Sequence, residues 1–155
     1  LHSDTHSFPT RRSSDLMVRK ILFNVKKYTV DTKVDDLGGP LGPVLLEPTK
    51  IYVQAVLSCL DNGVDHRDIV HITGGGFYEN IPRILPETCA AAVKRSSFSI
   101  PPIFDLLQKE GEVKEEEMFT TFNMGIGLMM VFTREDADAA LDTLSKYGES
   151  PVIIG

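Results

Sequence analysis

Three consecutive glycines form the stretch of this chain whose residue types best suit ligand binding. Gly74, Gly75 and Gly76 follow a short apolar run, residues 69–72, and precede a segment with helical character. Glycine can adopt positive φ values and lets another molecule approach the backbone closely. The first turn of a helix presents unpaired N–H groups, which suit an anion such as phosphate. The same residues could equally form a tight turn without a ligand, and the spacing leaves both interpretations open.

Other polar residues near this stretch do not form a recognisable catalytic set. His71 lies inside the apolar run, where a packed, hydrogen-bonded histidine is the commoner case than a base. Tyr52 falls on the apolar face of an expected helix, which favours a core position. Asn123 could donate to a ligand or to a neighbouring turn. The sequence therefore assigns no catalytic base, and the catalytic residues stay unknown.

Side chains that bind metals lack the spacing of known sites. The acidic residues Asp31, Asp35 and Asp36 lie in a stretch rich in glycine and proline, which is typical of a solvated loop. The two cysteines, Cys59 and Cys89, form no CxxC or Cys/His cluster. We therefore expect reduced thiols, a cytoplasmic location and no metal site.

Length and composition favour one globular domain. The chain has 155 residues, of which 42% are hydrophobic and 25% charged, and a hydrophobic core of useful size is possible. The net charge of −6 argues against nucleic acid as a partner. No apolar run approaches the length of a membrane-spanning helix, and no signal-peptide core is present. We expect neither a nucleic-acid nor a membrane partner.

The hydrophobic periodicity predicts an α+β domain. We expect helices at residues 17–28, 50–60, 77–85, 102–109, 115–122 and 134–147. We expect strands at residues 69–72, 89–94, 126–132 and 151–154, with the third covered on both faces because it is apolar throughout. Residues 29–44 are predicted to be a loop. Thr49 and Thr133 are the expected N-caps of the helices that follow them.

Residues 1–16 differ from the rest of the chain. They are rich in Ser, Thr and His and have no periodic apolar pattern. We interpret them as a non-native or disordered leader and exclude them from the site, although the first helix could start within them, with Ser14 or Asp15 as a cap. Residues 17–155 form the expected domain.

Four motifs, in order, resemble one enzyme family. They are LLEPTKIYV at 45–53, HITGGGFYENIPRILP at 71–86, PPIFDLLQKEGEV at 101–113 and FNMGIGLMMV at 122–131. Together they resemble the C-terminal domain of aminoimidazole ribonucleotide synthetase (phosphoribosylformylglycinamidine cyclo-ligase). The resemblance covers residues 17–155, with the C-terminal end of the family's domain missing. It implies a layered α/β/α mixed sheet, the C-terminal domain of the aminoimidazole ribonucleotide synthetase-like fold.

The resemblance also implies a reaction in de novo purine biosynthesis. ATP activates the formyl oxygen of phosphoribosylformylglycinamidine, an amidine nitrogen attacks, and ADP and phosphate leave as aminoimidazole ribonucleotide forms. ATP and Mg²⁺ would bind mainly through an N-terminal domain that is absent from this chain, and the full-length enzyme would be a homodimer. The residues expected to line the substrate phosphate site are Thr73, Gly74, Gly75, Gly76 and Asn80, with Thr49 and Asn123 as weaker candidates.

Substitution of Gly75 by valine is then expected to block phosphate approach while leaving the fold mostly intact. Two other interpretations stay open. The domain could act alone, as a phosphate-ligand binding or dimerisation module without catalysis. It could also be an inactive piece of an interrupted gene, in which case the fragment shows no ATP-dependent cyclisation until the missing domain is supplied.

Overall fold

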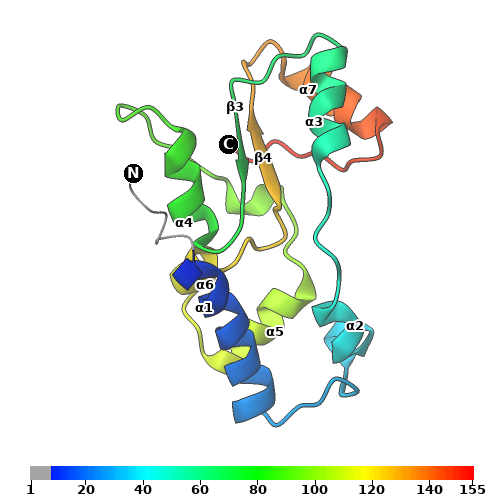
Figure 1. The fold of residues 1–155 in the computed structure, drawn as a ribbon, viewed down its shortest axis with the longest axis vertical. Helices are drawn as coiled ribbons and strands as arrows, with labels where there is room; N and C mark the ends of the chain where they lie inside the picture. Colours follow the sequence, from blue (N-terminus) through cyan, green and yellow to red (C-terminus); the bar gives the residue numbers. More distant parts are fainter. Residues whose placement is uncertain (1–7) are drawn as a thin grey trace.

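Helices dominate the chain, and its strands form two short antiparallel pairs, so the fold is α+β. The computed structural model describes residues 8–155, with side chains described from Ser14 onward. The molecule is elongated, with α2 and α5 toward one end and α3 and α7 at the other (Figure 1). Within residues 8–155, no helix is both long and apolar enough to cross a membrane.

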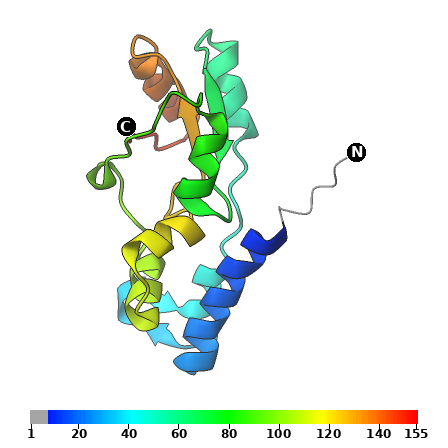
Figure 2. The same cartoon turned by 90° about the vertical axis from the view of Figure 1, so that its left-hand side faces the viewer.

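A helical cluster makes up one end of the molecule. The first helix continues into a π-helical turn, Lys20–Val25, and lies along α5 and α6 (Figure 2). The fully buried side chains here are Leu22, Leu41, Leu107 and Met118. The elements of this cluster are α1 (Phe8–Arg19), β1 (Lys33–Val34), a 3₁₀ turn (Asp35–Leu37), β2 (Gly39–Pro40), α2 (Leu41–Leu45), α5 (Pro102–Gly111) and α6 (Glu115–Thr121).

The second sheet contains the strand predicted before the three glycines, at residues 69–72. In it β3 (Asp68–His71) pairs with β4 (Leu128–Val131) in antiparallel register, with Asp68 opposite Val131 and His71 opposite Leu128. The pairing continues past the strand because the Ile72 N–H donates to the Gly127 carbonyl at 2.9 Å. These bonds place the start of β4 beside the end of β3.

Alternation along the two strands gives the sheet two different faces. Val70 and Met129 pack with α4 (Gly76–Asn80) and the 3₁₀ turn Ile81–Ile84. Met130 packs on the other face with α3 (Val53–Asp61) and α7 (Ala137–Lys146). The glycine loop therefore leads from the sheet to the helix that covers one of its faces.

Most predicted elements are present, with shifted ends. The helices expected at 77–85, 102–109 and 115–122 are found, the first as an α-helical turn followed by a 3₁₀ turn. Thr133 caps the turn before α7 and not the helix itself, whose N-cap position is Asp136: the Thr133 hydroxyl accepts from the Asp136 N–H at 3.2 Å and donates to the Asp136 carboxylate at 2.7 Å. The regular helix starts only at Ala137.

Helix starts were predicted less well. The first helix begins at Phe8, inside the segment interpreted as a leader, and ends at Val25, so Ser14 and Asp15 are internal residues and not caps. Residues 1–7 lie outside the described residues. Thr49 does not cap α3, because that helix starts at Val53 after an irregular stretch. The predicted loop 29–44 holds the β1–β2 hairpin and α2.

The predicted mixed sheet is not formed by the described residues, whose strands pair only in antiparallel fashion. Segments 89–94 and 151–154 are not strands; they run beside each other but share a single backbone bond, from the Lys94 N–H to the Ile154 carbonyl at 2.6 Å. The prediction of a fully covered strand at 126–132 is also wrong. β4 pairs only with β3, its residues are half-buried, and Val131 is 37% exposed.

Candidate functional site

The glycine loop is a tight connection between β3 and α4. Gly75 and Gly76 adopt φ values of 93° and 54°, which a residue with a Cβ atom adopts only with strain. The Gly76 N–H donates to the Thr73 carbonyl at 3.0 Å and closes the turn. The loop therefore needs glycine for its own backbone geometry, whether or not it binds a ligand.

Close packing against α6 is a second reason for glycine at position 76. A Cβ atom there would overlap the carbonyl oxygen of Phe119 and would lie 2.8 Å from that of Phe122. At Gly75 a Cβ atom would lie 2.8 Å from the Cβ atom of Glu79. A valine at position 75 would be strained and crowded, which counts against the expectation that this substitution leaves the fold mostly intact.

Asn80 holds the loop from inside. Its side chain is 1% exposed, and its Nδ2 donates to the carbonyls of Gly76 at 2.7 Å and Gly74 at 3.3 Å, and more loosely to that of Thr73 at 3.5 Å. Its Oδ1 accepts from the Arg83 guanidinium at 3.3 Å. The Asn80 amide is thus committed to the loop and fixes its shape.

Two backbone donors on the loop lack a hydrogen-bond partner among the described residues, one on the half-buried Gly74 and one on the buried Gly75. Within residues 8–155, the N–H groups of Gly74 and Gly75 make no hydrogen bond. Successive free N–H groups in a turn that includes a positive φ value form a concave site for anions. Asn80 supports this turn from inside.

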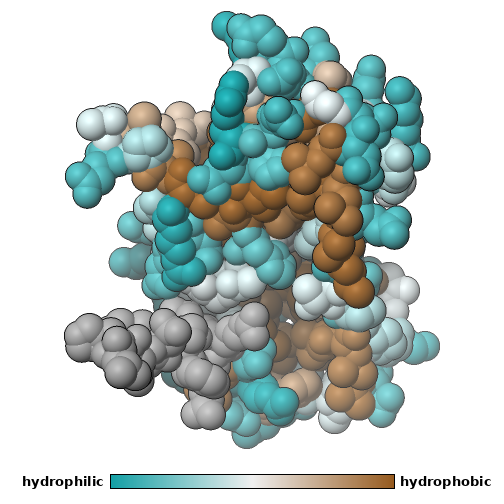
Figure 3. Space-filling model, turned by 45° about the horizontal axis from the view of Figure 1, so that its top comes forward, coloured by the Kyte–Doolittle hydropathy of each residue, from teal (hydrophilic) through white to brown (hydrophobic). Residues whose placement is uncertain are grey.

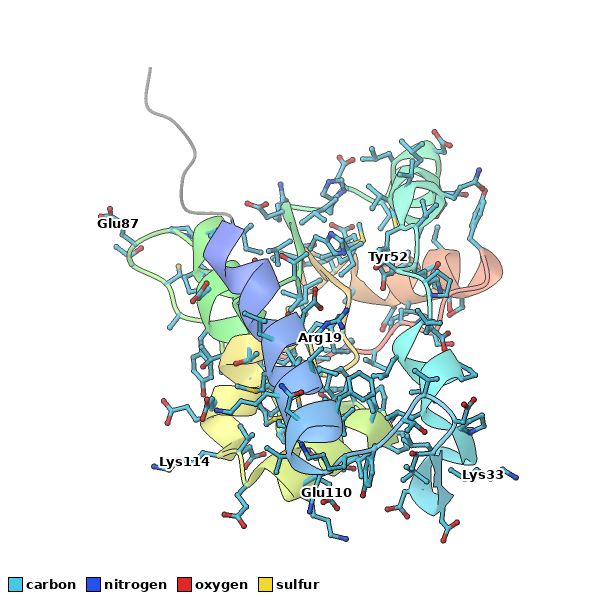
Figure 4. The ribbon with its side chains drawn as sticks, turned by 60° about the horizontal axis from the view of Figure 1, so that its bottom comes forward. Arg19, Lys33, Tyr52, Glu87, Glu110 and Lys114 are labelled. Carbon is cyan, nitrogen blue, oxygen red and sulfur yellow. The ribbon has the colours of Figure 1, made fainter. Side chains whose placement is uncertain are left out.

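Glycine contacts also bring the other motif segments to the same end of the sheet. A Cβ atom at Gly127 would overlap the hydroxyl of Tyr52, and one at Gly125 would lie 2.5 Å from the ring of Pro101. The ring of Tyr52 meets that of His71 edge to face, with centroids 6.0 Å apart. Figure 4 shows Tyr52 in the segment that leads into α3, next to the strands. Segments far apart in sequence therefore meet where β3 ends.

The weaker candidates have different surroundings. Asn123 accepts a hydrogen bond from the Gly125 N–H at 3.1 Å through its Oδ1, so it stabilises the turn before β4. Thr49 is exposed in the irregular stretch before α3 and makes no hydrogen bond with any described residue. The structure gives no contact between Thr49 and the glycine loop.

Sequence reasoning missed two features near the loop. One is the contact between the half-buried ring of Tyr52 and the exposed ring of His71. The sequence pattern had favoured a core position for Tyr52. The other is a cavity of about 830 Å³ beside α4, where the Arg95 guanidinium lies over the rings of Phe98 and Phe119 and pairs with Glu115 at 3.4 Å. Arg95 and these aromatic residues come from separate segments, so the spacing of residues along the sequence does not indicate that they meet. Among the described residues, no group of three or more His, Cys, Asp or Glu side chains could hold a metal ion.

Known proteins resemble this chain along most of its length. It is 50% identical over 139 residues to a phosphoribosylformylglycinamidine cyclo-ligase of Lachnoclostridium phytofermentans, covering 90% of this chain and 40% of that protein. A protein of the same name from Alkaliphilus metalliredigens is 49% identical over 139 residues, with the same shares covered. One from Caldanaerobacter subterraneus is 41% identical over 155 residues, covering 100% of this chain and 43% of that protein.

The chain thus spans about two-fifths of the length of these relatives. The sequence profile of the family described as AIR synthase related protein, C-terminal domain, matches residues 19–155. This match includes the glycine loop, Asn80, the Tyr52–His71 contact and the turn before β4. The chain belongs to the AIR synthase related protein family, as its C-terminal domain.

Proposed function

We propose that this chain is the part of a phosphoribosylformylglycinamidine cyclo-ligase that binds the phosphate of the substrate. The observation that carries the proposal is the glycine loop, whose Gly74 and Gly75 N–H groups are free and whose shape is fixed by Asn80. The names of relatives that share 41–50% identity support the same assignment.

The proposed site consists of Thr73, Gly74, Gly75, Gly76 and Asn80. The glycines bind phosphate oxygens through the backbone, and Thr73 adds a hydroxyl beside them. Asn80 acts indirectly, by holding the carbonyls of the loop. Thr49 and Asn123 are weaker candidates for this site. Asn123 supports the neighbouring turn.

In the proposed reaction the whole enzyme closes an imidazole ring. ATP converts the formyl oxygen into a phosphate ester, an amidine nitrogen attacks the formyl carbon, and ADP and phosphate leave. The described residues hold no acidic cluster suited to Mg²⁺. We propose that ATP and Mg²⁺ bind chiefly through the part of the enzyme that this chain does not span.

The layered mixed sheet belongs to our proposal for the full-length enzyme. We infer that segments 89–94 and 151–154, already joined by one backbone bond, extend the β3–β4 sheet there into a layered mixed sheet. A homodimer in the cytoplasm is part of the same proposal. The alternative is a stand-alone phosphate-binding or dimerisation module; ATP-dependent cyclisation by the isolated chain would contradict our assignment of ATP.

Amide NMR spectra of the isolated chain test the phosphate site. Ribose 5-phosphate is the probe, because it carries the phosphate ester of the proposed substrate without its reactive group, and ribose is the matched control. We expect ribose 5-phosphate to shift the amide signals of Gly74 and Gly75 and ribose to leave them unchanged. Shifts confined to other segments, or none at all, would overturn the assignment of the loop.

A further inference from the structure

The cavity beside α4 has aromatic walls that the proposed phosphate site does not use. Its volume of about 830 Å³ is typical of small-molecule sites, and its lining includes neither residues 73–76 nor Asn80. The walls come from α4, from residues 85–98 and from α6. The buried rings of Phe77 and Phe98 and the half-buried ring of Phe119 form its aromatic part.

Phe77 holds the three rings together. Its ring meets that of Phe98 edge to face, with centroids 5.9 Å apart, and lies tilted against that of Phe119 at 5.2 Å. The face of an aromatic ring carries partial negative charge and attracts cations. The cavity therefore combines an apolar wall with a surface suited to a positive charge.

Arg95 of the chain itself lies on this surface. Its guanidinium carbon is 6.0 Å from the ring centroid of Phe98 and 5.7 Å from that of Phe119, near the outer limit of a cation–π contact. Its Nε pairs with Glu115 at 3.4 Å, and the two side chains are 51% and 65% exposed. Because so exposed an ion pair contributes little to stability, the guanidinium can leave this place at small cost.

Negative charge exceeds positive charge around the cavity. Glu87, Glu115 and Glu116 line it, and Arg95 is the single cation that the described residues contribute to the lining. Neither Glu87 nor Glu116 forms a salt bridge with any described residue. Glu87 lies on the loop that follows α4, at its outer end (Figure 4). A cation with an apolar body is thus complementary both to the walls and to the surplus carboxylates.

We propose that this cavity binds a small organic cation, namely an ammonium or guanidinium group on an aromatic or aliphatic body, and that Arg95 is a displaceable occupant of the same place. The charged group of the ligand lies between Glu115 and the rings of Phe98 and Phe119, and its body packs on the apolar walls. This site goes beyond the proposed function and uses none of its residues.

Amide NMR spectra of the isolated chain test the site with three matched compounds. Benzylguanidine is the cation, benzylurea has nearly the same shape without the charge, and phenylacetate carries a negative charge on a similar ring. We expect benzylguanidine to shift the amide signals of Phe77, Val93 and Phe98, with a dissociation constant about tenfold lower than that of benzylurea. Phenylacetate should bind more weakly than both. Equal dissociation constants, or no shifts at these residues, would overturn the proposal.

Arg95→Ala distinguishes a displaceable occupant from a residue that binds the ligand. Loss of the guanidinium frees the two rings and Glu115, so benzylguanidine should bind this variant about threefold to tenfold more tightly than the parent chain. An unchanged or weaker affinity would contradict the role given to Arg95. Phenylacetate binding tightest of the three compounds, and lost in Arg95→Ala, would show that the cavity takes anions instead.

A second substitution in the Arg95→Ala chain tests the carboxylate. Glu115→Gln should there weaken benzylguanidine about fivefold and leave benzylurea unchanged. Glu117→Gln is the matched control, because Glu117 is an exposed carboxylate of the same helix turn that does not line the cavity. Equal losses from the two substitutions would mean that the net charge of the chain, and not this cavity, attracts the cation. No phosphate compound enters these measurements, so their failure leaves the proposed function standing.

Discussion

Asn80 shows how one buried side chain can fix the shape of a loop from inside. Its amide donates to loop carbonyls at 2.7 Å and 3.3 Å, and these groups are buried together beneath the turn. A buried carbonyl that loses its donor keeps the cost of desolvation. The stability of the loop therefore depends on Asn80, and so does phosphate binding in the function that we propose.

Substitution of Asn80 tests this dependence. Asn80→Ala should lower the free energy of unfolding by about 1–3 kcal/mol, because carbonyls are left unpaired. Asn80→Asp should lower it further at neutral pH, since a carboxylate would face those carbonyls. Thr49→Ala, at an exposed residue without a hydrogen bond, is the control and should stay within about 0.5 kcal/mol. Chemical denaturation measures all three, and an unchanged Asn80→Ala variant would remove Asn80 from the support of the loop.

The two cysteines should react very differently. Cys59 is fully buried, and burial raises the pKa of its thiol, which the hydrogen bond with Ser58 offsets in part. Cys89 is exposed. We expect iodoacetamide to modify Cys89 in the native chain and Cys59 only on unfolding, as mass spectrometry of the labelled peptides would show. Equal labelling of both thiols in the native chain would contradict the packing of α3.

The raised pKa of Cys59 also makes the free energy of unfolding depend on pH. The folded chain binds the thiol proton more tightly than the unfolded chain, so this contribution is complete below the ordinary thiol pKa of about 8.5 and is lost as pH rises through the raised value. A Cys59→Ala variant should lack that alkaline loss in denaturation curves measured on both sides of this range.

Among the elements, the contact between the glycine loop and α6 joins the sheet to the helical cluster. Gly76 approaches the last turn of α6 so closely that the Phe119 carbonyl would overlap a Cβ atom. Phe77 and Phe119 continue this contact, with ring centroids 5.2 Å apart. Because the loop and α6 come from separate segments, the approach fixes their relative position.

A pair of glycine variants separates backbone strain from this contact. Gly63→Ala changes a glycine with φ of 71° and nothing within 4 Å, so it should cost only the strain of that conformation, about 1–2 kcal/mol. Gly76→Ala has similar strain and also displaces α6, so its loss in unfolding free energy should exceed that of Gly63→Ala clearly. Equal losses in chemical denaturation would mean that α6 moves away without cost.

The sequence predicted helices and strands well where their signal lies within a few neighbouring residues. The apolar run before the glycines and the helix after Thr133 are found because periodicity and capping act within a few residues. Segments 89–94 and 151–154 were mistaken because a strand exists only through its partners, and here they share a single backbone bond. The role of Asn80 was likewise hidden, since an asparagine near a glycine loop suggests a ligand contact as readily as an internal support.

Large apolar side chains are exposed on the surface of the described residues. Apolar side chains form a continuous band on one face rather than scattered spots (Figure 3). The most exposed large apolar residues are Leu46, at 81%, and Ile51, at 80%, on the stretch between α2 and α3. Exposed apolar surface of this kind favours association in water.

We therefore expect the isolated chain to self-associate through this stretch. The double variant Leu46→Ala/Ile51→Ala should sediment more nearly as a monomer than the parent chain at the same concentration. Its free energy of unfolding should stay within about 1 kcal/mol of the parent value, because neither side chain is packed. Leu41→Ala is the matched control: the same residue type, fully buried, should lose about 2–5 kcal/mol. A double variant as unstable as Leu41→Ala would show that Leu46 and Ile51 are covered in solution, and a parent chain that is already monomeric would show that this stretch does not bind another copy.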